Sequence, residues 1–202
     1  MQIKSILNDW GVIVPDDAYI AELLLESRPK QCYYMDALPL TVDRKNAEKF
    51  YQVEMFFQRV LEGEVLKEDF LLLEMKYRKV MIKLWLYNEL IIEYTFPERE
   101  IKNIPQIIDK PYLKRFKELH SQYVDTSSII IKEKMDLELF IQSAMRDVLC
   151  TTYFLKEYEL IIIPSWSCFV VYFNDINKFQ TVKDIAFSEG LFLRPCNKTV
   201  SM

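Results

Sequence analysis

Glycine and histidine are scarce in this chain of 202 residues, which holds three glycines and one histidine. Phosphate-binding loops and the nucleophile turn of serine hydrolases need two or more glycines at fixed spacing, and neither pattern occurs. The helical zinc-protease motif needs two histidines and is excluded for that reason. We therefore predict no catalytic residue and no bound cofactor.

The four cysteines are Cys32, Cys150, Cys168 and Cys196, and they form no CxxC pair. None has a neighbouring histidine, so the spacing that zinc sites need is absent and no metal site is predicted. A chain this rich in apolar residues builds a core without covalent links. We expect free, mostly buried thiols, with disulfides as the alternative.

Long hydrophobic runs are also missing. The first ten residues, MQIKSILNDW, contain one lysine and no apolar run of the length found in signal peptides. The apolar run at 160–163 is far shorter than the roughly 20 residues that cross a bilayer. We expect a cytoplasmic protein without membrane contact.

Charge is unevenly distributed along the chain, whose formal net charge is −4. Residues 1–100 carry 13 Lys and Arg against 18 Asp and Glu, whereas residues 101–202 carry 13 against 12. Two basic clusters, around 76–83 and 110–117, have acids close by and are interpreted as solvated faces. We therefore predict no nucleic-acid partner and a preference of the first half for a cationic one.

What the chain does contain is ample material for a core, because 50% of its residues are hydrophobic and 14% are aromatic. The pattern begins with helices. Val14 to Asp17 is typical of a helix start, and this helix should run to Ser27, before Arg28–Pro29. A second helix is expected from Asp43, as N-cap, to Gly63.

After Gly63 the hydrophobic residues recur at every second position. Residues 79–87 and 90–96 alternate in hydrophobicity and predict an antiparallel hairpin with its turn at Asn88–Glu89. Residues 66–78 fit either a helix or a strand, and we favour a strand, which would extend the hairpin to a three-stranded meander. Residues 112–123 predict an amphipathic helix.

The last third predicts the order α-β-β-α-β over a largely antiparallel sheet, an α+β fold. Its elements follow a linker at 124–128 and are a helix at 136–148, strands at 158–163 and 168–173, a helix from 174 to a cap at Gly190, and a strand at 191–194. We predict two segments, 1–125 and 126–202, with one compact domain as the alternative.

Acidic and aromatic residues around the predicted hairpin form the candidate site. Glu89 and Glu93 lie four residues apart, so in a strand they project from the same face. The predicted partner-binding residues are Trp85, Tyr87, Glu89, Glu93, Glu98, Glu100 and Trp166. Trp166 lies between two apolar strands and either packs over the sheet or anchors a partner.

Three interpretations of these acids remain: a carboxylate site for a metal ion or a glycosidic bond, a solvated sheet face, or a docking surface. His120, the only imidazole, lies at the border of an apolar helix face and favours a structural role.

The leading hypothesis is a non-catalytic protein-binding module. Its most concrete version is an immunity- or antitoxin-like inhibitor that docks a basic partner such as a nuclease toxin. The alternatives are a carboxylate-dependent hydrolase, with or without a divalent metal, and a structural subunit that forms a homodimer through its sheet edge.

Overall fold

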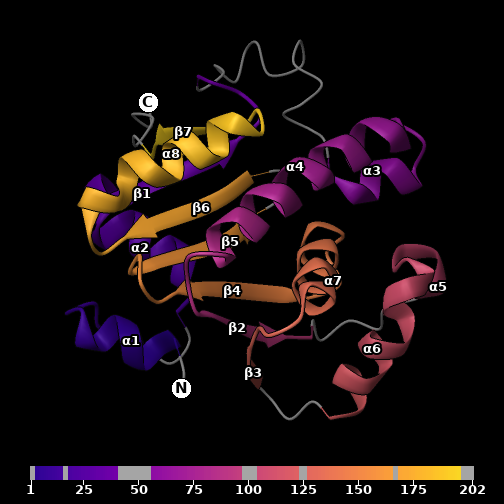
Figure 1. Cartoon of the computed structure of the whole chain (residues 1–202), viewed down its shortest axis with the longest axis horizontal. Coiled ribbons are helices and arrows are strands. Elements are labelled where there is room, and N and C mark those ends of the chain that lie inside the picture. Colours follow the sequence, from indigo (N-terminus) through magenta and orange to yellow (C-terminus); the bar gives the residue numbers. More distant parts are fainter. Residues whose placement is uncertain are drawn as a thin grey trace.

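The structure, a computed structural model, describes residues 3–15, 18–40, 56–96, 104–122, 127–165 and 168–196. Within these residues a seven-stranded antiparallel sheet has the order β3-β2-β4-β5-β6-β1-β7 (Figure 1). Its strands are β1 (Cys32–Asp36), β2 (Leu90–Thr95), β3 (Ser127–Ile130), β4 (Cys150–Leu155), β5 (Leu160–Ser165), β6 (Cys168–Phe173) and β7 (Phe192–Pro195). The α+β class and the antiparallel sheet that the sequence predicts are confirmed.

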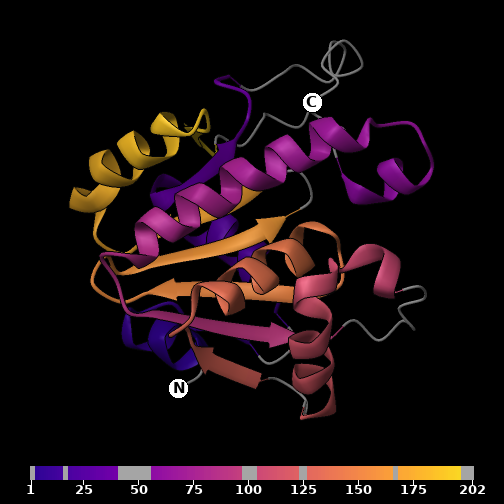
Figure 2. The same ribbon diagram turned by 45° about the vertical axis from the view of Figure 1, so that its right-hand side comes forward.

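Helices cover both faces of the sheet (Figures 1 and 2). The helices of the described residues are α1 (Ile3–Asp9), α2 (Ile20–Ser27), α3 (Phe57–Leu61), α4 (Lys67–Trp85), α5 (Ile104–Ile107), α6 (Lys110–Ser121), α7 (Lys134–Met145) and α8 (Phe179–Ser188). None of them is both long and apolar enough to cross a bilayer.

The period-two alternation of the strands divides the apolar residues into two cores. Leu90 and Ile92 of β2 join one core with α4, α7 and α8, whereas Ile91 joins a second core with α1 and α2. Both faces of the central strands are therefore buried, which explains why β5 and β6 are apolar almost throughout.

Helix α4 corrects the prediction for residues 66–87. The strand favoured over 66–78 and the strand at 79–87 are both wrong, because 67–85 form one helix of 19 residues. The hairpin and meander therefore do not form, although the strand predicted at 90–96 is present as β2. The buried residues of α4 follow the spacing i, i+3, i+4, i+7 and form one broad stripe along the helix: Phe70, Leu73, Glu74, Tyr77, Val80, Met81 and Leu84.

Strands β3 and β4 are missing from the sequence prediction, and β1 lies in residues 30–42, whose lack of a period indicates an irregular segment with a short strand as an option. β4 pairs with β2 and β5 in the middle of the sheet, and β3, whose first residues were expected to be a linker, pairs with β2 at its edge. The order after residue 126 is thus β-α-β-β-β-α-β. The predicted boundary at 125/126 falls between strands of one continuous sheet.

Several helix ends are as predicted. α2 ends at Ser27, just before Arg28–Pro29, and Gly190 follows α8 with φ +73, the left-handed conformation that suits a residue without a Cβ. Gly63 follows α3 with φ +75. The predicted N-cap Asp43 and the residues Asp16–Asp17 lie outside the described residues. The predicted helix starts are nevertheless corrected: α2 begins at Ile20 and not at 14–17, because residues 18 and 19 are not helical. The helix expected over 43–63 is not continuous either, because Phe56 is extended and α3 begins at Phe57.

Candidate functional site

Two turns meet at one end of the sheet and bring together part of the predicted site. Residues 86–89 connect α4 to β2, and residues 156–159 connect β4 to β5. These turns are adjacent because β2 and β4 are antiparallel partners, with Leu90 opposite Leu155. We call the surface formed by Leu86, Tyr87, Glu89, Lys156, Glu157, Tyr158 and Glu159 the acidic turn surface.

The side chain of Asn88 holds the two turns together. Its amide nitrogen donates to the Leu84 carbonyl at 2.7 Å, and its oxygen accepts from the Tyr158 backbone N–H at 2.9 Å. Asn88 is buried, so both bonds are shielded from water. Asn88, predicted to lie in a hairpin turn, therefore couples the end of α4 to the turn between β4 and β5.

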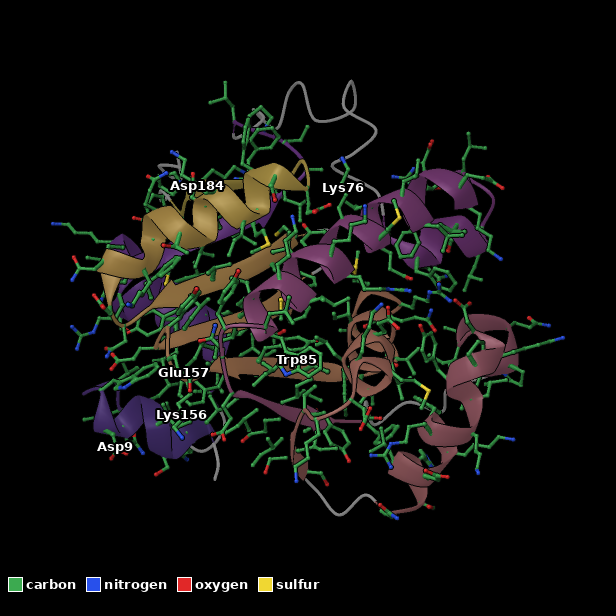
Figure 3. The ribbon with its side chains drawn as sticks, in the orientation of Figure 1. Asp9, Lys76, Trp85, Lys156, Glu157 and Asp184 are labelled. Atoms are coloured by element: carbon green, nitrogen blue, oxygen red, sulfur yellow. The ribbon has the colours of Figure 1, made fainter. Side chains whose placement is uncertain are left out.

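Backbone and side-chain contacts fix Glu89 on this surface. The Glu89 N–H donates to Glu157 Oε2 at 2.6 Å, and Lys156 Nζ lies 3.1 Å from Glu89 Oε1. Figure 3 shows Lys156 and Glu157 at the lower left of the view, near Asp9, with Trp85 closer to the middle. The acids of the turn thus lie in ordered positions without losing their exposure.

The predicted aromatic residues have different environments. Tyr87 is 64% exposed and Leu86 beside it is 70% exposed. Trp85 is half-buried and packs against the core under α4. Tyr87 is therefore available to a partner, whereas Trp85 contributes to packing as well.

A crevice of about 240 Å³ adjoins the acidic turn surface on the side of α1. Its charged lining consists of Asp9, Glu89 and Glu159 against a single lysine, Lys156. Sequence reasoning missed Asp9, Glu157 and Glu159. The pair of glutamates around Tyr158, at the tip of a hairpin, was the signal that could have found two of them.

Glu93 lies apart from these acids. It lies on β2, near the end away from Glu89, and its Oε2 accepts the Ile3 backbone N–H at 2.9 Å; Glu89 itself lies in the turn before the strand. Glu89 and Glu93 line different cavities, so they do not form a carboxylate pair. Glu98, Glu100 and Trp166 lie outside the described residues.

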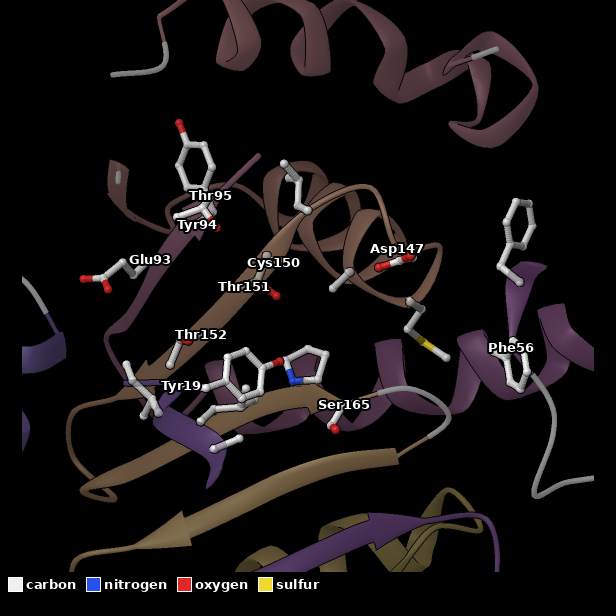
Figure 4. A pocket seen from close by; sticks show the side chains of 18 of the residues that line it. Tyr19, Phe56, Glu93, Tyr94, Thr95, Asp147, Cys150, Thr151, Thr152 and Ser165 are labelled. Carbon is white, nitrogen blue, oxygen red and sulfur yellow. The ribbon is translucent and has the colours of Figure 1, made fainter. Parts of the chain in front are cut away.

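A larger cavity of about 630 Å³ opens at that other end, where β2 and β5 finish and β4 begins (Figure 4). We call it the strand-end pocket. Its polar lining is Tyr19, Gln58, Glu93, Tyr94, Thr95, Asp147, Cys150, Thr151, Thr152 and Ser165, and its apolar wall includes Phe56, Phe57, Met145, Leu149 and Ile163.

Local structure explains how the polar residues reach this pocket. Glu93 is opposite Thr152, and Thr95 is opposite Cys150, so these side chains share one face of the sheet. Asp147, at φ 56, turns the chain from α7 into β4 in a left-handed conformation that aspartate tolerates. Burial raises the pKa of Tyr19, and the nearby Cys150, Glu22 and Asp147 raise it further.

Neither site contains His120. It is exposed on α6 and meets the Phe96 ring edge to face, with the two ring centroids 4.8 Å apart. In the described part of the chain, no three side chains of His, Cys, Asp or Glu are arranged to hold a metal ion. The two sites offer surfaces for binding, built from carboxylates, hydroxyls and aromatic rings.

The basic cluster around 76–83 is largely neutralised within the fold. Lys83 Nζ lies 2.6 Å from Glu189 Oε1, and Lys79 also reaches this carboxylate at 3.6 Å. The hydrogen bond from Lys83 lowers the pKa of Glu189. Arg78 pairs with the buried Glu74 at 2.7 Å, so most of this cluster is engaged within the protein.

No protein-family model, curated protein or solved structure matches this chain.

Proposed function

We propose that this protein is a non-catalytic binding module that docks a basic protein partner through the acidic turn surface. Its most concrete form is an immunity- or antitoxin-like inhibitor of a basic protein such as a nuclease toxin. The observation that carries the proposal is the exposed pair Leu86 and Tyr87 directly beside the ordered acids Glu89 and Glu157.

The chemistry of the surface suits such a partner. Exposed tyrosine is enriched among the residues that dominate binding energy at protein interfaces, because its ring buries a large area at small entropic cost. Acids around it attract a basic surface during encounter and raise the association rate. The Asn88 hydrogen bonds hold both turns in place, so little order has to be gained on binding.

Affinity purification from native lysate at low salt, with four tagged proteins, tests the proposal. The wild type and Asp184→Lys, a charge reversal on the exposed face of α8, are expected to retain the same stoichiometric basic protein. Tyr87→Ala and Glu89→Lys are expected to lose it, because they remove the anchor and reverse one charge of the docking surface. Salt should release the partner from the wild type, since it screens the attraction between the charged surfaces.

Circular dichroism of each variant controls for folding. A partner that remains bound to both Tyr87→Ala and Glu89→Lys would contradict docking at this surface. Absence of any stoichiometric basic protein from the wild type would contradict the proposed function itself.

A further inference from the structure

The strand-end pocket lies at the opposite end of β2, β4 and β5 from the acidic turn surface. Its volume of about 630 Å³ is within the range of small-molecule sites. Its walls come from the ends of β2 and β5, the start of β4, the turn from α7 to β4, and the first residues of α2 and α3, so several separate segments of the chain bound it. The pocket and the turn surface share no residue.

Charge narrows the class of ligand. Glu93 and Asp147 are the charged side chains among the described residues that line the pocket, and no lysine, arginine or histidine lines it there. One oxygen of Glu93 accepts the Ile3 N–H, which fixes the orientation of this carboxylate. An anionic ligand would meet like charge, whereas an organic cation would meet a positioned carboxylate.

The uncharged residues that line the pocket restrict the class of ligand further. Tyr19 is 55% exposed and supplies an aromatic ring that can attract a cation, whereas the rings of Phe56 and Phe57 already lie under Arg59 and Arg146. Apolar side chains such as Ile163 provide surface that can bury an apolar group. Hydroxyl groups such as that of Thr152 add acceptors for an ammonium N–H. We propose that the strand-end pocket binds a small organic ammonium ion with an apolar or aromatic body, with its nitrogen at Glu93. This proposal is independent of the docking function.

The thiol of Cys150 can report whether a ligand occupies this pocket. Cys150 is exposed and lines the pocket, whereas burial raises the pKa of the Cys32, Cys168 and Cys196 thiols to about 12. Since the thiolate is the reactive form, an alkylating reagent near neutral pH should modify Cys150 first. A ligand in the pocket covers this thiol and slows its alkylation.

The test measures the rate at which iodoacetamide modifies Cys150, by intact mass and peptide mapping, at increasing concentrations of three probes of similar size. These are 2-phenylethylamine, a cation; 2-phenylethanol, which is neutral; and phenylacetate, an anion. Saturable protection by 2-phenylethylamine is expected, with the other two at least about tenfold weaker, because they lack the charge-assisted hydrogen bond to Glu93.

Glu93→Gln removes the charge but keeps an oxygen that accepts from Ile3. This variant should need about tenfold more 2-phenylethylamine for half protection. Glu26→Gln, on the exposed face of α2, is the matched control and should behave as the wild type. Amide chemical shifts of residues 19 and 150–152 provide a second readout that does not depend on the thiol.

Equal protection by all three probes would overturn the assignment of a cationic ligand. The absence of saturable protection and of chemical-shift changes with 2-phenylethylamine would overturn the site. The two proposals fail separately, because Glu93→Gln should still retain the basic protein that Tyr87→Ala loses.

Discussion

At the scale of single residues, a buried ion pair joins Glu74 of α4 to Arg146, which directly follows α7. Arg146 Nε lies 2.7 Å from Glu74 Oε2, and both side chains are 2% exposed. The same guanidinium donates to Asp109 at 2.9 Å and lies over the Phe57 ring. Burial lowers the pKa of Arg146, but its contacts with Glu74 and Asp109 more than offset this and raise it.

Removing one partner of this pair should be costly. Arg146→Met leaves Glu74 buried with Arg78 as its remaining cation, and we expect a loss of about 3 kcal/mol in the free energy of unfolding, measured by urea denaturation. Lys134→Met, which removes the exposed pair with Glu138, should cost less than about 1 kcal/mol. Equal losses of unfolding free energy for the two substitutions would show that the buried Arg146–Glu74 pair adds little to stability.

At the scale of elements, α4 shows why local alternation misled the sequence analysis. Val80, Ile82 and Leu84 alternate with polar or weakly apolar residues, as in a strand with one open face. In the structure the adjacent residues Val80 and Met81 are both fully buried, because α7 and α8 pack on two sides of this helix. A strand with one exposed face would bury only one of these neighbours.

Alanine substitutions along α4 separate the two arrangements. Val80→Ala and Met81→Ala should each lower the free energy of unfolding by about 2 kcal/mol, because each leaves a cavity in the core. Leu72→Ala, on the exposed side of the same helix, should change it by less than about 0.5 kcal/mol. Chemical denaturation of the three variants provides the measurement, and a large effect at only one of positions 80 and 81 would contradict the helical packing.

At the scale of the whole molecule, buried thiol and phenol groups make the free energy of unfolding fall at alkaline pH. Burial raises the pKa of Cys32, Cys168 and Cys196 to about 12, and it also raises the pKa of Tyr77. In the unfolded chain thiols ionise near pH 8.5. Between these values the folded protein holds more protons than the unfolded one, so its stability is complete below about pH 8.5 and falls as the pH rises towards 12.

The thiol contribution appears as a change of slope. Cys32→Ala should make the decline of unfolding free energy between pH 9.5 and 11 shallower by about 1 kcal/mol per pH unit. Val170→Ala, at another buried position on the same face of the sheet, should lower stability without changing this slope. Urea denaturation across this pH range tests it, and parallel curves for the two variants would exclude the thiol as the cause.

The sequence predicted elements best where a segment has one period and a clear end. β5, β6, α6 and the Gly190 cap each combine these features, and all four are present. α1 was missed although Ile3, Ile6 and Leu7 have helical spacing, because so short a segment is helical only when it packs on the sheet.

The composition and periods of the sequence by themselves determined an α+β fold with an antiparallel sheet, because apolar spacing is a local property of each segment. Tertiary structure alone decided which acids meet. Four residues of extended strand span about 13 Å, so Glu93 is carried away from Glu89 to the far end of β2. Antiparallel pairing brings the turn at 156–159 beside Glu89 instead, although Glu89 and Lys156 are 67 positions apart in the chain.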